Sequence, residues 1–87
     1  MEHVIVERVF SEPVDLAALS QRFADGAACF ELRNVRILRS AVSLDGLRML
    51  CEYSAPDAES VQAANDSAAL PYERIWTARV LEPRKNG

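Results

Sequence analysis

The chain of 87 residues is long enough for one hydrophobic core and too short for two. Hydrophobic residues make up 49% of it and charged residues 26%, which is typical of a globular domain rather than a disordered segment. The formal net charge of −3, without a stripe of lysine and arginine, argues against nucleic acid as a partner. No apolar run is long enough to span a membrane, and two cysteines without metal-ligand spacing predict reduced thiols in a cytoplasmic protein.

The first part of the chain predicts a strand followed by an interrupted helix. Residues 3–10, HVIVERVF, are rich in β-branched side chains, and the Ser-Glu-Pro sequence after them ends the strand. Apolar residues then recur every three or four positions over residues 14–32, which indicates a helix with one buried stripe. Asp25 and Gly26 interrupt this spacing and predict either a kinked helix or a short second helical turn that carries Cys29 and Phe30.

The second part predicts a hairpin, a helix and a last strand. Residues 35–54 form the hairpin, with its turn at Asp45-Gly46. The helix begins near Pro56, with Ser54 or Asp57 as its cap, and ends before Pro71. Residues 73–82 follow as the fourth strand. We expect residues 1–83 to form a single domain and residues 84–87 to be a disordered tail.

The order of these elements, β-α-β-β-α-β, is that of the α+β ferredoxin-like fold. Right-handed crossovers then predict a four-stranded antiparallel sheet with strand order 4-1-3-2 and both helices on one face.

A two-residue turn fixes which residues of the hairpin lie opposite each other and which share a face. One face then holds the pairs Leu38 with Tyr53, Ser40 with Cys51, and Val42 with Met49. The other holds Ile37 with Ser54, Arg39 with Glu52, and Ala41 with Leu50. The first face is nearly all apolar, so we expect it to lie under the helices. The second face mixes an arginine–glutamate pair with hydrocarbon.

The first strand also carries a charge on each side, Glu7 on one and Arg8 on the other, both among apolar residues. Which of them faces the helices stays open. A sheet that is covered on one side only alternates cleanly between apolar and polar residues, and this one does not. We therefore expect a second copy of the chain to cover the open face, giving a homodimer with a cavity between the two sheets.

Three stretches resemble one family: VIVERVF, LRSAVSLDGLRMLCEYSAPDAESV and LPYERIW. Together they are similar to the small bacterial nickel-binding ferredoxin-like proteins, a family otherwise made up of domains of unknown function, over residues 4–83. The resemblance implies a ferredoxin-like fold, a homodimer and a divalent-metal site. Relatives carry histidines where this chain has Arg33 and Ala64, and its only histidine is His3. Because nickel favours imidazole and only His3 supplies it, we expect no bound cofactor and assign no residues to the nickel site that the resemblance implies.

The candidate ligand-binding residues are the polar groups expected on or beside the open face. They form the wall of the cavity between the sheets: Glu7, Arg8, Arg39, Ser40, Glu52 and Trp76. Two structural alternatives stay open. Glu7 and Arg8 could form an ion pair with Arg39 or Glu52 that fixes strand register, and Trp76 could anchor the dimer.

The residues favour a binding domain over an enzyme. Cys51 has Ser40, Met49 and Tyr53 as neighbours on its face, which predicts a buried and inert thiol. No general base tuned near neutral pH is evident, because His3 lies at a strand end. We therefore expect a non-catalytic homodimer that binds a small ligand or cation between its sheets. The alternatives are a cofactor-free enzyme of the dimeric ferredoxin-like barrel type and a purely structural interaction module.

Overall fold

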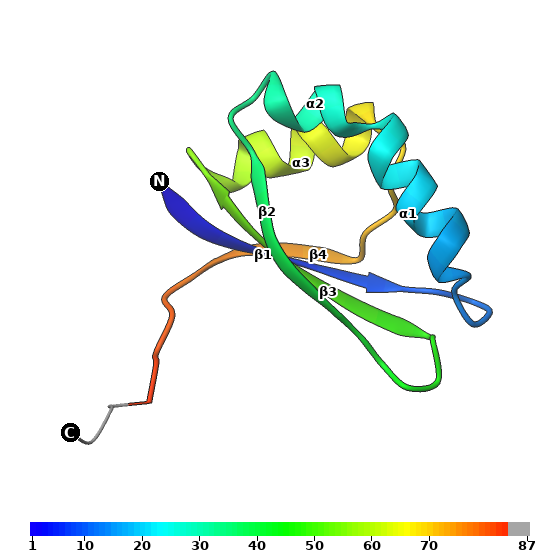
Figure 1. Ribbon diagram of the computed structural model, residues 1–87. Helices are drawn as coiled ribbons and strands as arrows, with labels where there is room; N and C mark the ends of the chain where they lie inside the picture. The colour runs from blue at the N-terminus through cyan, green and yellow to red at the C-terminus, as the bar shows by residue number, and fades with distance from the viewer. Residues whose placement is uncertain (84–87) are drawn as a thin grey trace.

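The computed structural model describes residues 1–83, so the expected disordered tail, residues 84–87, lies outside the described residues. Four antiparallel strands form one sheet in the order β2-β3-β1-β4, and the helices lie together on one side of it (Figure 1). The elements are β1 (Glu2–Val9), α1 (Leu16–Asp25), α2 (Ala27–Glu31), β2 (Arg36–Val42), β3 (Arg48–Ala55), α3 (Ala58–Ser67) and β4 (Arg74–Ala78). The predicted fold class and strand order are confirmed. Among residues 1–83, no helix is both long and apolar enough to cross a membrane.

The helices begin and end at residues that their sequences favour. The carboxylate of Asp15 accepts hydrogen bonds from the amides of Ala17 and Ala18 at the start of α1, and Asp57 does the same for Ser60 in α3. Asp57, and not Ser54, is therefore the cap of the last helix. The interruption at Gly26 yields the second of the two predicted outcomes, the separate short helix α2.

Gly26 also allows the junction of α1 and α2 to lie against the end of α3. A Cβ atom on this residue would lie 2.6 Å from the Cβ of Ala68, a distance that real side chains do not tolerate.

The core lies between the sheet and this helical layer. Its buried side chains come from β1, β3, α1, α3 and the residue before β2: Val4, Val6, Leu19, Val35, Met49, Cys51, Tyr53, Ala55, Val61 and Ala64. Since Val4 and Val6 face the helices, Arg8 does too, and it is only 2% exposed. Glu7 points to the opposite face, together with His3 and Ile5. The facing that the sequence left open is thus settled in favour of a buried arginine.

The hairpin has the predicted register near its turn and a different one further away. Arg39 lies opposite Glu52 and Val42 opposite Met49, as expected. A β-bulge at Leu38 then shifts the pairing, so that Ile37, and not Leu38, lies opposite Tyr53. The predicted facing of Ile37 and Leu38 is therefore wrong. The bulge adds one residue to β2, which exchanges the faces of these two side chains.

Strand β2 is the part of the sheet that the helices cover least. Helix α3 packs over β1, β3 and β4, whereas six of the seven β2 residues are exposed to solvent. Between α1, α2 and the inner side of β2 the sheet is therefore left with a hollow. The last strand, at the other edge, is shorter than the predicted 73–82 and ends at Ala78.

Candidate functional site

The six predicted site residues do not lie on one face of the sheet. Glu7, Arg39, Glu52 and Trp76 lie on the face away from the helices, which we call the open face. Arg8 and Ser40 point toward the helices, and the Ser40 hydroxyl lies 3.3 Å from the sulfur of Cys51. The single polar wall proposed from sequence is therefore divided between two separate sites.

On the open face, three ionisable side chains from three strands form a cluster. The Nε2 atom of His3 lies 2.8 Å from one carboxylate oxygen of Glu52, and Arg39 donates its Nε–H to the other oxygen. We call His3, Arg39 and Glu52 the open-face cluster. The Arg39 hydrogen bond, followed by that from His3, lowers the pKa of the Glu52 carboxyl below its usual value. The pairing of Arg39 with Glu52 was expected, whereas the part played by His3 was not.

Glu7 does not join this cluster. The Trp76 indole donates its Nε1–H to the Glu7 carboxylate at 2.6 Å, a contact between neighbouring strands β1 and β4. Within residues 1–83, neither Glu7 nor Arg8 lies within ion-pair distance of Arg39, Glu52 or any other charged side chain. The alternative in which Glu7 and Arg8 pair with Arg39 or Glu52 is thus wrong.

A hollow of about 600 Å³ lies beside the open-face cluster. It is enclosed by the cluster itself, by Leu38 of the bulge, and by residues 80–83 that follow β4. Large apolar side chains are distributed over the same face. Ile5 is only 6% exposed, but Leu50 and Trp76 are 36% and 42% exposed, and Leu38 and Val9 are about half exposed. The open face therefore combines ordered charges with hydrocarbon that remains partly in water.

Beneath the helices, Arg8 forms a second polar site. Its Nη1 donates to the carbonyl of Pro71 at 2.8 Å, and its Nη2 donates to Asn65 Oδ1 at 2.8 Å and to the Tyr53 hydroxyl at 3.1 Å. The guanidinium carbon lies 5.4 Å from the centre of the Phe23 ring. The buried Nε–H has no acceptor among the described residues. All the acceptors are neutral, so the buried charge has no carboxylate beside it.

Asn65 is the partner that sequence reasoning missed. It is fully buried in α3 next to the apolar position Ala64, and its Nδ2 donates to the carbonyl of Val61. An asparagine inside an alanine-rich apolar stripe is a signal that a buried polar partner lies opposite. The sequence could not identify Arg8 as the group opposite Asn65, because it did not show which side of β1 faces the helices.

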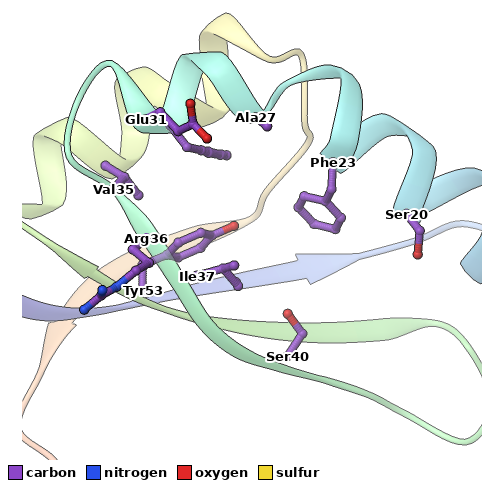
Figure 2. A pocket seen from close by; sticks show the side chains of 10 residues that line it. Ser20, Phe23, Ala27, Glu31, Val35, Arg36, Ile37, Ser40 and Tyr53 are labelled. Atoms are coloured by element: carbon purple, nitrogen blue, oxygen red, sulfur yellow. The ribbon is translucent and has the colours of Figure 1, made fainter.

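A pocket of about 440 Å³ occupies the hollow between α1, α2 and β2. Figure 2 shows Phe23, Val35, Ile37 and Tyr53 around it, with Ser20 and Ser40 toward one end. Phe30 also lines it and packs edge-on against Tyr53, with ring centres 5.6 Å apart. The pocket is therefore mostly apolar, with the Tyr53 hydroxyl as its most buried polar group.

The metal-ligating side chains are scattered in the described part of the chain. No group of three histidine, cysteine, aspartate or glutamate residues gathers there. Cys51 is fully buried, as predicted, Cys29 is partly buried on α2, and both thiols are free.

The comparisons with known proteins agree with this architecture. The profile of one family, described as nickel responsive protein SCO4226-like, matches residues 4–77. The crystal structure of SCO4226 from Streptomyces coelicolor A3(2) superposes with a TM-score of 0.81 at 18% identity, covering 92% of this chain and 99% of that one.

A second solved structure shares the fold more distantly. The P2 domain of the chemotaxis kinase CheA, solved in complex with the response regulator CheY from Thermotoga maritima, superposes with a TM-score of 0.54 at 18% identity. The match covers 91% of this chain and 98% of the domain. No curated protein matches the sequence. Because the family profile spans most of the chain, this protein belongs to the SCO4226-like family of nickel responsive proteins.

Proposed function

We propose that this protein is a non-catalytic, cytoplasmic binding domain that pairs with a second copy of itself through the open face. The two sheets would then enclose a small polar ligand beside the open-face cluster. The observation that supports this proposal is the composition of the open face, where an ordered charge cluster lies among Leu38, Leu50 and Trp76. A face that is used only for contact with water seldom carries so much hydrocarbon.

A second copy is the simplest cover for this surface. A chain of this length buries a smaller fraction of its surface on folding than a larger domain does, so pairing adds apolar burial that the monomer lacks. Trp76 lies near one edge of the face and is 42% exposed, as expected of an aromatic side chain that anchors an interface.

Nickel itself does not fit the residues that one chain provides. The family name implies this metal, and His3 and Glu52 are the nearest pair of suitable donors. Arg39 already donates to the same carboxylate, and a cation would have to be held beside this guanidinium. The remaining N–H groups of Arg39, which is 77% exposed, instead favour a small anion. Arg39 and His3 would hold that anion, and the Glu7–Trp76 pair lies elsewhere on the same face, outside the lining of this hollow.

Fewer observations support the alternative function, a cofactor-free enzyme of the dimeric ferredoxin-like barrel type. Such an enzyme needs a general base in an enclosed apolar cavity. Glu7, the candidate base, lies instead on the half-exposed face with its carboxylate hydrogen-bonded to Trp76.

Light scattering coupled to gel filtration tests the dimer. We expect the wild-type chain to elute with twice the mass of one copy, and Leu50→Glu to elute as a monomer because it places a charge in the interface. Leu32→Glu is the matched control, since Leu32 is an exposed leucine on the helical side and its replacement should leave the dimer intact. A wild-type chain that stays monomeric at every concentration tested would contradict the proposal.

Isothermal titration tests the ligand. We expect the wild-type dimer to bind phosphate or a small dicarboxylate, Arg39→Ala to lose that binding, and Ni²⁺ to bind no more tightly than Mg²⁺. Arg36→Ala, which changes an exposed arginine outside the cluster, is the control. If nickel binds tightly and the anions do not, the assignment of ligand class is wrong while the dimer stands.

A further inference from the structure

The pocket between α1, α2 and β2 is separate from the open face, because it lies on the helical side of the sheet. Its volume of about 440 Å³ falls in the range of pockets that hold small organic molecules, roughly 300 to 1,000 Å³. Phe23, Phe30, Val35 and Ile37 supply its apolar walls. These walls suit the hydrocarbon part of a ligand.

The Tyr53 hydroxyl gives this pocket a hydrogen-bond donor. Its oxygen accepts a hydrogen bond from Arg8, and its own O–H hydrogen can be donated either to the neighbouring Cys51 sulfur or to a ligand. In Figure 2 the hydroxyl points toward the side of the pocket where Phe23 lies. Burial raises the pKa of Tyr53, which keeps the phenol protonated at neutral pH. A ligand oxygen that enters the pocket would therefore meet a donor polarised by a positive charge.

Arg8 supplies that charge. The guanidinium is 2% exposed, its three acceptors are neutral, and its Nε–H is left without one among residues 1–83. A buried cation without a counter-charge is unfavourable, and an anion nearby relieves that cost. The Phe23 ring and the Tyr53 side chain touch Arg8 and also line the pocket, so the charge lies directly behind the pocket wall.

We propose that this pocket binds a small organic carboxylate. Its hydrocarbon part would lie between Phe23, Phe30 and Ile37. Its carboxylate would accept a hydrogen bond from the Tyr53 hydroxyl, close to the buried Arg8. Glu31 and Arg36 stand at the rim with opposite charges. Their electric fields largely offset each other for an entering ligand, so the buried arginine decides which sign of ligand charge the pocket prefers. The pocket should favour an anion over a neutral or cationic molecule of the same shape.

Three eight-carbon probes test this preference: octanoate, 1-octanol and octylammonium. Titrations followed by amide resonances in NMR spectra report both affinity and position. We expect octanoate to shift amides of residues 20–37 and to bind at least tenfold more tightly than octanol, with octylammonium weaker still. Equal affinity for the three probes would overturn the proposal, as would shifts confined to the open face or an absence of binding by octanoate.

Two variants locate the site. Tyr53→Phe should weaken octanoate binding roughly tenfold and octanol binding by less, because the hydroxyl donates a stronger hydrogen bond to a carboxylate than to an alcohol oxygen. Ile37→Trp is a second variant on the exposed edge strand, where folding is least at risk, and it should abolish binding of both probes by filling the pocket. Leu32→Trp, at an exposed leucine of the helical side that lines neither the pocket nor the open-face hollow, is its control. If Ile37→Trp binds octanoate as the wild type does, the site lies elsewhere.

Discussion

The two faces of this sheet hold an arginine in opposite ways. Arg8, under the helices, is buried and hydrogen-bonded to an amide, a phenol and a backbone carbonyl. Arg39, on the open face, is 77% exposed and paired with the carboxylate of Glu52. The same side chain is thus held by neutral oxygens where water is excluded and by an opposite charge where water remains.

This difference has a physical reason. To bury a carboxylate next to Arg8 would require the dehydration of two ions, and the attraction between them repays this only with excellent geometry. Neutral acceptors dehydrate more easily, and each still gains from a hydrogen bond to a charged donor. The Arg8 network is therefore held by neutral groups in a buried environment. The open-face cluster remains in contact with water, which competes for the same donors and acceptors.

The largest effect should come from the buried arginine. Arg8→Met leaves Asn65, Tyr53 and Pro71 without their donor in a dry environment, and we expect a loss of about 3 kcal/mol in the free energy of unfolding. Urea unfolding followed by circular dichroism measures it. Arg39→Met, at the exposed arginine, is the matched control and should unfold close to the wild type. Equal losses of unfolding free energy in the two variants would contradict the difference between a buried, structural arginine and an exposed one.

A smaller effect sharpens the comparison on the open face itself. Ile5 is 6% exposed although it points away from the helices, so its neighbours on the sheet already exclude water from it. We expect Ile5→Ala to destabilise the fold by about 2 kcal/mol in the same urea experiment. At dilutions where the chain is monomeric, Leu50→Ala, which starts from a side chain 36% exposed, should lose less. The opposite ranking would indicate that the exposed leucine is buried by a partner under the conditions used.

The smallest effect is a dependence on pH. The pKa of Glu52 is lower in the folded chain than its ordinary value of 4.5, so its contribution to stability is fully present above that value. The contribution is lost as the pH falls through the lower, folded-state pKa. As the pH falls below about 5, the free energy of unfolding should therefore decrease less steeply in Glu52→Gln than in the wild type.

Thermal unfolding across that range, with Glu12→Gln as the control, measures this dependence. The Glu12 carboxylate accepts no hydrogen bond from the described residues. An unchanged slope in Glu52→Gln would show that the open-face cluster does not persist in solution.

The fold could be predicted because its signals are local. The Asp45-Gly46 turn fixed the hairpin and the register of Arg39 with Glu52, and helical spacing with proline and glycine boundaries placed the helices. The bulge at Leu38 gave no such signal, since it inserts one residue without a glycine or proline to mark it. The faces of Ile37 and Leu38 were therefore assigned the wrong way round.

The site could be predicted only where its residues lie directly opposite each other in one hairpin. Arg39 and Glu52 satisfy this condition, but His3 reaches the cluster through the separate pairing of β1 with β3. The facing of Arg8 could not be read from β1, because that strand has apolar residues on both sides. Its partner Asn65 is 57 residues away, a distance over which alternating hydrophobicity gives no information.

The Arg8 network also bears on how the chain is synthesised. Its acceptors lie 45, 57 and 63 residues further along, and the last of them, the carbonyl of Pro71, precedes only the final strand. While the chain emerges from the ribosome, the guanidinium has to stay hydrated until Pro71 is available. This domain should therefore complete its folding only after Pro71 has left the ribosome, and a nascent chain that ends at residue 70 should remain sensitive to proteases.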